Sequence, residues 1–102
     1  MKNPIHIPKG VLQELYHLFD QHLTGKVKIL LFGSRATGNH RPDSDVDLAL
    51  SSDEDRSNQI NELNKAISQA ELPLAVELID YHEASEETLN RIHNEGVVIW
   101  IN

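Results

Sequence analysis

Residues 31–50, LFGSRATGNHRPDSDVDLAL, decide the fold of this 102-residue chain. An apolar run ends abruptly at Gly33-Ser34, and a polar segment that contains glycine and proline follows. A second apolar run then begins at Val46 and carries acidic side chains at its start. This pattern predicts two strands that meet at one polar site.

The second run alternates between acidic and apolar residues. Successive side chains of a strand point to opposite faces of the sheet. Asp45 and Asp47 therefore share one face, and the core face receives the apolar residues: Val46, Leu48 and Leu50. Two carboxylates on one face repel each other unless water or a cation lies between them. Mg2+ is the cation we expect, because it takes oxygen ligands and is often shared between carboxylates and substrate phosphates.

The Gly33-Ser34 turn is the candidate phosphate contact. Glycine allows a close backbone approach, and the amides and hydroxyl of Ser34 at the start of a short helix favour an anion. Residues 33–38 also fit the first six positions of the Walker phosphate-binding pattern, but Asn39 and His40 stand where Lys and Ser or Thr are required. The sequence therefore excludes a P-loop.

Composition limits the possible functions. Nine basic and sixteen acidic residues give a formal net charge of −7, which opposes binding to an extended nucleic acid. There is no cysteine, which excludes thiolate catalysis. The first ten residues contain no apolar signal region, and no run approaches the ~20 apolar residues of a membrane span. We expect a cytoplasmic protein without a membrane partner, organised as one domain over residues 1–102.

Hydrophobic periodicity predicts alternating helices and strands. Helical spacing covers residues 11–23 and 60–70, and a third helix is expected between a capping Ser85 and Gly96. Short apolar runs predict strands at 27–32, 46–50, 74–81 and 97–101. The order implies an α/β or α+β fold with about four strands and three main helices, in which strand 27–32 is central and buried on both faces.

The third strand contains an acidic residue of interest. Alternation puts Glu77 on one face together with Ala75 and Ile79. A carboxylate among apolar neighbours is expensive to bury without compensation, so we expect Glu77 to lie beside the two aspartates.

These motifs resemble the DNA polymerase beta-like nucleotidyltransferases. Gly33-Ser34, a short helical turn and then Ser44-Asp45-Val46-Asp47-Leu48 are similar to the family's GS…DxD signature. The shortness of the chain and the later VELID strand resemble the minimal nucleotidyltransferases. The likeness implies a single nucleotidyltransferase domain with a mixed sheet.

The resemblance also implies roles for single residues. Gly33, Ser34, Arg35 and Ser44 would bind the nucleoside triphosphate. Three carboxylates would be catalytic and hold two Mg2+ ions, with Glu77 in place of the family's usual aspartate: Asp45, Asp47 and Glu77. Members of this kind are typically paired with a helical HEPN-type protein, and several transfer AMP from ATP to that toxin.

Two hypotheses remain open at this point. The chain is either a Mg2+-dependent transferase that moves AMP from ATP to a hydroxyl of a HEPN-type partner, or an inactive nucleotide-binding subunit that neutralises its partner by binding alone. The glutamate at position 77 motivates the second hypothesis. A second copy of the chain is a further possible partner.

Overall fold

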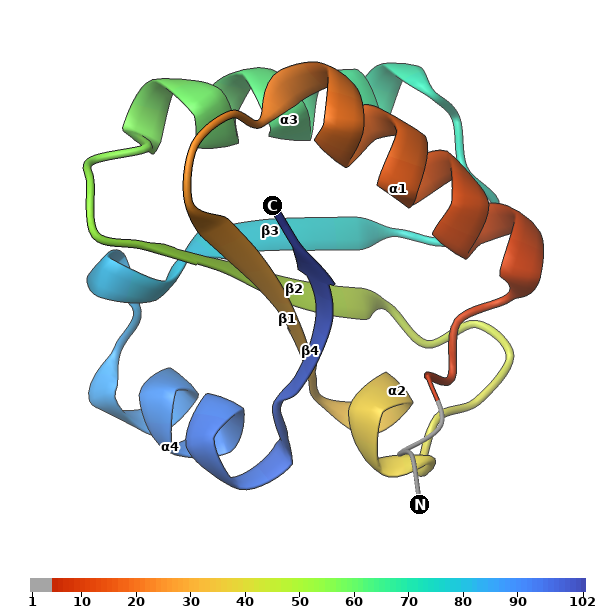
Figure 1. The fold of residues 1–102 in the computed structure, drawn as a ribbon. Helices are drawn as coiled ribbons and strands as arrows, with labels where there is room; N and C mark the ends of the chain where they lie inside the picture. The colour runs from red at the N-terminus through yellow and green to blue at the C-terminus, as the bar shows by residue number, and fades with distance from the viewer. Residues whose placement is uncertain (1–4) are drawn as a thin grey trace.

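The computed structural model describes residues 5–102, which form a sheet with helices on both faces (Figure 1). In chain order the elements are α1 (Lys9–His22), β1 (Val27–Phe32), α2 (Ser34–Thr37), β2 (Val46–Ser52), α3 (Ser57–Gln69), β3 (Val76–Asp80), the 3-10 turn η1 (Tyr81–Glu83), α4 (Glu86–Glu95) and β4 (Val97–Ile101). The predicted α/β class is confirmed, since every predicted helix and strand is present. None of the helices in the described part of the chain has the length and apolar content needed to cross a membrane.

The four strands form one mixed sheet in the order β3-β2-β1-β4. β1 pairs antiparallel with both β2 and β4, whereas β2 and β3 run parallel. A parallel pair needs a crossover connection, and α3 supplies it. β1 and β2 are therefore the interior strands, and β3 and β4 form the two edges.

One face of the sheet is covered by α1 and α3 (Figure 1). The apolar stripes of both helices meet the apolar side of the sheet. The largest fully buried side chains are Phe19, Leu15, Ile29, Leu31, Leu48, Leu50, Leu63 and Val46. The Phe19 ring of α1 lies 5.6 Å from the Trp100 ring of β4, so Trp100 packs on α1. This face holds the main core.

The opposite face is covered only in part. Phe32, Ala49 and Ile92 form a small buried cluster beneath α4. The expectation that β1 is buried on both faces is wrong for its first half, because Lys28 is exposed and Leu30 is only half-buried. The reason is that α4 is short and covers the sheet near the end of β1. Polar side chains can therefore reach the sheet on this side.

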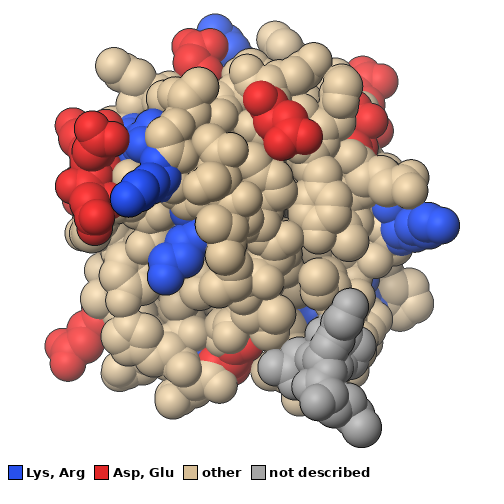
Figure 2. All heavy atoms as spheres, viewed as in Figure 1, with Lys and Arg blue, Asp and Glu red and all other residues tan. Residues whose placement is uncertain are grey.

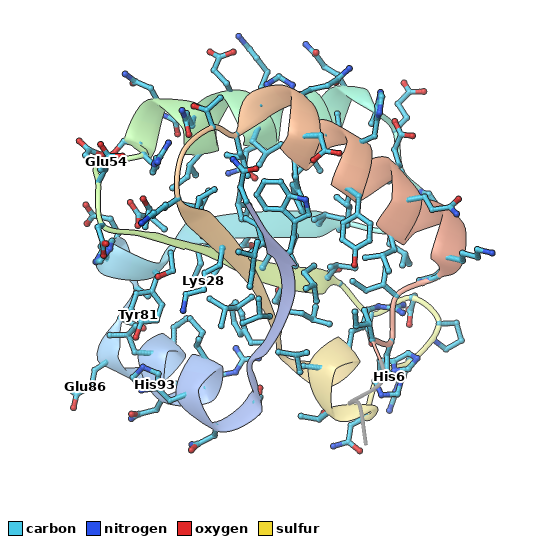
Figure 3. The ribbon with its side chains drawn as sticks, viewed as in Figure 1. His6, Lys28, Glu54, Tyr81, Glu86 and His93 are labelled. Atoms are coloured by element: carbon cyan, nitrogen blue, oxygen red, sulfur yellow. The ribbon has the colours of Figure 1, made fainter. Side chains whose placement is uncertain are left out.

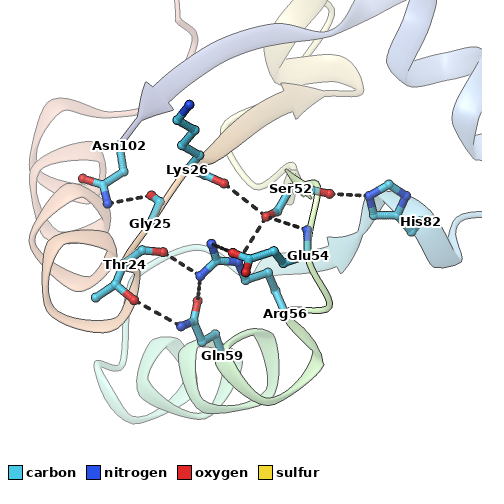
Figure 4. A network of polar contacts seen from close by, with 9 residues as sticks. All are labelled: Thr24, Gly25, Lys26, Ser52, Glu54, Arg56, Gln59, His82 and Asn102. Carbon is cyan, nitrogen blue, oxygen red and sulfur yellow. Dashed lines mark hydrogen bonds and ion pairs between the residues drawn. The ribbon is translucent and has the colours of Figure 1, made fainter.

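A buried arginine joins the loops at the far end of β2 (Figure 4). Arg56 is only 7% exposed and donates to the carbonyl of Thr24 at 2.5 Å and to the hydroxyl of Ser52 at 3.1 Å. It also pairs with Glu54 at 3.1 Å. Charge-assisted hydrogen bonds of this kind fix loop geometry, so the start of β1 and the end of β2 are held together.

The surface charges are dispersed on the face shown in Figure 2. Blue basic side chains stand as separate groups on that face, several of them next to red acidic ones. Acidic and basic side chains are thus interspersed on this face.

The joint between α4 and β4 depends on the absence of a side chain. Ser85 caps α4, as predicted, by accepting a hydrogen bond from the Thr88 amide at 3.2 Å. Gly96 ends the helix, and a Cβ added there would overlap the carbonyl oxygen of Ile92. Because that atom belongs to the backbone, a side chain at position 96 forces the joint to move.

We predict that Gly96→Ala lowers the free energy of unfolding by about 1–3 kcal/mol, the usual cost of overpacking. Urea denaturation followed by circular dichroism measures it. Gly10→Ala is the matched control, because nothing lies within 4 Å of the added methyl group. It should raise stability by about 0.5 kcal/mol through helix propensity. Equal stability of Gly96→Ala and the parent protein would contradict this account of the joint.

Candidate functional site

Asp47 lies at the junction of three strands. It sits in β2 opposite Phe32 of β1 on one side and opposite Glu77 of β3 on the other. Neighbouring strands are about 4.8 Å apart, and directly paired residues point to the same face of a sheet. Asp47 and Glu77 therefore lie side by side, and Asp45 precedes the same strand by one residue.

The electrostatic surroundings of Asp47 favour a cation or a proton. Burial raises the pKa of Asp47 above its ordinary value of 3.8, and the nearby Arg91 guanidinium acts in the opposite direction. The carboxylates of Glu77, Asp45 and Glu95 add to the rise in the pKa of Asp47. The site therefore has an excess of negative charge around a half-buried carboxylate.

The carboxylates do not form a closed metal site. Within residues 5–102, no three Asp, Glu or His side chains come close enough together to hold a metal ion. Glu77 is exposed because β3 is an edge strand, so the expected cost of burying it does not arise. The arrangement nevertheless fits Mg2+, because that ion commonly takes only one or two protein carboxylates together with substrate phosphates and water.

Gly33 brings the backbone into direct contact with this group. It follows Phe32 at the end of β1 with φ of 81°, in the left-handed region that favours glycine. A Cβ at this position would lie 2.7 Å from Oδ2 of Asp47 and 3.2 Å from a terminal nitrogen of Arg91. The Gly33 amide donates a hydrogen bond to Oε1 of Glu95 at 3.0 Å. No other residue fits this turn without displacing the charged groups.

Ser34 begins the short helix α2 directly after this turn. Its side chain is half-buried, and its carbonyl accepts a hydrogen bond from the Gly38 amide at 2.9 Å. Gly38 has φ of 89° and ends the helix in the left-handed conformation. The two glycines thus hold Ser34 at the end of β1, next to the carboxylates.

Arg35, which the sequence predicts to contact the triphosphate, is bound to the loop before β2. Its side chain is 3% exposed, and the guanidinium donates to the carbonyls of His6, Ser44, Arg41 and Pro42 at 2.9 to 3.2 Å. Figure 3 shows His6 beside this loop. Arg35 is therefore a structural residue that fixes the segment leading to Asp45.

The hydroxyl of Ser44 is also engaged in the loop. It accepts a hydrogen bond from the Arg41 amide at 2.8 Å. This bond is typical of a turn in which a serine side chain replaces a backbone acceptor. The hydroxyl thus stabilises the loop before β2, and its contact with nucleotide stays a prediction.

Sequence reasoning missed two charged residues of α4. Arg91 lies over the ring of Phe32, 5.3 Å from its centroid, and its Nε is 4.0 Å from Oε1 of Glu95. Neither belongs to a recognised motif. The available signal was their spacing, since residues four apart share one helix face and the buried Ile92 orients that helix.

A tyrosine-histidine pair holds α4 against η1. The hydroxyl of Tyr81 in η1 lies 2.6 Å from Nε2 of His93 in α4. Figure 3 shows these two side chains close together, with His93 coming from the last turn of α4. The pair and the cluster under α4 hold Arg91 and Glu95 over the end of β1.

Comparison with known proteins agrees with this geometry. The family model described as polymerase beta, nucleotidyltransferase matches residues 13–102, which include Gly33, both aspartates and Glu77. The chain belongs to this nucleotidyltransferase family.

Individual relatives of this nucleotidyltransferase include an adenylyltransferase and proteins from toxin-antitoxin complexes. A probable protein adenylyltransferase MntA from Haemophilus influenzae is 35% identical over 80 residues, which cover 78% of this chain and 70% of the relative. A toxin-antitoxin crystal structure with AMP-PNP has a TM-score of 0.68 at 26% identity, covering 87% of this chain and 72% of the other. A structure of a tri-AMPylated Shewanella oneidensis HEPN toxin with its MNT antitoxin has a TM-score of 0.60 at 22% identity. The match covers 90% of this chain and 71% of the other chain. The last of these supports the fold alone.

The raised pKa of Asp47 in this nucleotidyltransferase leads to a pH-dependent prediction. A carboxyl whose pKa is higher in the folded state costs stability once it ionises, so the penalty is present at neutral pH and absent in acid. Asp47→Asn should therefore be more stable than the parent protein at pH 7. The difference should shrink as the pH falls toward and below 3.8. Urea denaturation at several pH values measures it.

Asp55 supplies the control of opposite sign. Hydrogen bonds from the hydroxyl and amide of Ser57 lower the pKa of Asp55, so its ionised form stabilises the fold. Asp55→Asn should lose stability at neutral pH, with the loss fading as the pH falls through the lowered pKa. If both variants shift stability in the same direction, the charge environment assigned to Asp47 is wrong.

Proposed function

We propose that this chain is a Mg2+-dependent nucleotidyltransferase that moves AMP from ATP to a hydroxyl of a helical HEPN-type toxin, and so acts as its antitoxin. The observation that carries the proposal is the meeting of Asp47 with Gly33 on one side and Glu77 on the other. The glycine turn lets the backbone amides approach a phosphate closely, and the carboxylates can hold a metal ion. Transfer of a nucleotidyl group from a triphosphate requires both.

The relatives support the choice of reaction and partner. The Haemophilus influenzae protein is described as a probable protein adenylyltransferase, which names both the donor group and the class of acceptor. A toxin-antitoxin structure at 26% identity contains AMP-PNP, an analogue of ATP in which an NH group replaces the oxygen between the β and γ phosphates. ATP as substrate and a toxin as acceptor are therefore the first choices for this chain.

Asp45 and Asp47 are the residues that would hold Mg2+ together with the triphosphate. When bound, Mg2+ neutralises charge on the phosphates and on the departing pyrophosphate. The Gly33 amide and Ser34 would face the phosphates from the other side of the site. Arg35 contributes indirectly, because its bonds to the carbonyls before Asp45 fix where that aspartate lies.

The transfer itself is a substitution at the α-phosphorus of ATP. The acceptor hydroxyl oxygen forms a bond to this phosphorus, and the bond from the α-phosphorus to the bridging oxygen breaks. Pyrophosphate leaves with the electron pair of that bond. Glu77 takes the hydroxyl proton, since its carboxylate is exposed and lies beside Asp47.

The second candidate function is neutralisation of the partner by binding alone. Two observations favour it. The Gly33 amide is already occupied by Glu95, and the carboxylates do not converge into a metal site within residues 5–102. A protein that binds its partner without transferring AMP would tolerate both features.

Mass spectrometry of the partner separates the two functions. A HEPN-type partner incubated with this protein, ATP and Mg2+ should gain AMP on one or more hydroxyl groups. Asp45→Asn should abolish the gain without unfolding the protein, because Asp45 is exposed and lies outside the core. EDTA should abolish it as well. An unmodified partner in a stable complex with the parent protein would instead establish the binding function.

Glu77 and Asp80 form a matched pair of variants on the same strand. Glu77→Gln should lose transfer, because the amide cannot accept the proton, and Glu77→Asp should keep or raise it. Asp80→Asn should change transfer little, since Asp80 lies on the other face and accepts the His82 amide at 3.0 Å. Initial rates of AMP incorporation measure all three. An inactive Asp80→Asn beside an active Glu77→Gln would refute the role of Glu77.

A further inference from the structure

The last two turns of α4 place a cation and a carboxylate against the Gly33 turn. The Gly33 amide donates to Oε1 of Glu95 at 3.0 Å, and the same oxygen lies 4.0 Å from Nε of Arg91. A terminal nitrogen of Arg91 lies 3.2 Å from the place where a Gly33 Cβ would stand. The turn proposed to hold phosphate is thus already in contact with an anion of the protein itself.

The carboxylate oxygen of Glu95 marks a position that suits an anion. One backbone donor and one guanidinium surround it, and both groups bind phosphate oxygens as readily as carboxylate oxygens. A phosphate oxygen placed there would find the same two partners. Glu95 and a phosphate therefore cannot occupy the position together.

Arg91 is able to change partners. Its side chain is 47% exposed, its contact with Glu95 is long, and its second contact is the face of Phe32. Exposed ion pairs of this kind contribute little to stability, so exchanging one anion for another costs little. Arg35, by comparison, is buried and bound to four carbonyls. Of these two arginines, Arg91 is the one that lies at the Gly33 turn with a side chain free to change partners.

We propose that Arg91 binds the triphosphate of the nucleotide and that Glu95 occupies the same position when nucleotide is absent. This inference rests on the proposed nucleotidyltransferase function and assigns it a phosphate-binding residue on α4. Entry of the nucleotide displaces the Glu95 carboxylate from the Gly33 amide. Arg91 then turns from Glu95 and Asp47 to the phosphates, which leaves the Asp47 carboxylate to the cation.

The proposal gives opposite predictions for two neighbouring residues. Arg91→Gln should weaken binding of ATP with Mg2+ by about tenfold or more, because a charge-assisted contact is lost. Glu95→Gln should strengthen binding several-fold, because a neutral amide competes less well for the Gly33 amide and Arg91. Arg91→Lys should fall between Arg91→Gln and the parent protein, since the charge stays but the planar fork is lost.

Isothermal titration calorimetry with two probes tests these predictions. The probes are ATP and inorganic tripolyphosphate, each with Mg2+; Arg91→Gln should affect both, since the contact is to phosphate. Lys65→Gln is the control, because it removes one exposed positive charge from α3 on the opposite side of the sheet. Its affinity should equal that of the parent protein. Circular dichroism verifies that each variant is folded.

The outcomes separate this inference from the function on which it rests. If the parent protein binds ATP and Arg91→Gln binds it equally well, the inference is overturned and the proposed function stands. A parent protein that binds neither probe overturns both. Weaker binding by Glu95→Gln than by the parent protein also overturns the inference, because Glu95 would then assist the nucleotide.

Discussion

The antiparallel register of β1 with β2 is the constraint on which the site depends. It sets Phe32 opposite Asp47, so that the turn after β1 starts where the acidic face of β2 begins. A slip of one residue would turn Asp47 toward the core beneath α1 and α3 and would bring Val46 to the polar face. The core side chains of β2 prevent this slip, since Val46 and Leu48 are fully buried. Hydrophobic burial thereby fixes the position of a polar site.

The partial covering of the second face has a comparable effect on electrostatics. Full burial of Asp47 would be expensive, because a charged carboxylate without a paired cation loses its hydration. The short helix instead leaves Asp47 half-buried and brings one cation, Arg91, together with one further carboxylate, Glu95. The ionised Asp47 carboxylate therefore lowers the stability of the fold, as is common for charged groups in ligand-binding sites. The excess of negative charge is what a divalent cation and a nucleotide would jointly relieve.

The sequence by itself determined the elements and the central pair of acidic positions. Alternation over residues 45–50 reports directly which side chains share a face, because the period of a strand is fixed by its backbone. Gly33 could be identified in the same way, since an abrupt end of an apolar run at glycine is a local signal. Local rules also predicted the Ser85 cap of α4, and the pattern as a whole indicated the family.

Only the tertiary structure decided which charged side chains surround Asp47. Arg35 is adjacent to the turn in sequence yet points into the loop before β2, whereas Arg91 comes from a helix more than fifty residues later. Glu77 lies beside Asp47 as expected, but its exposure follows from the place of β3 at the sheet edge. The sequence placed Glu95 on the same helix face as Arg91, but nothing local indicated that this face meets the Gly33 turn. Periodicity specifies the face on which a side chain lies, but its neighbours across elements depend on how the helices pack on the sheet.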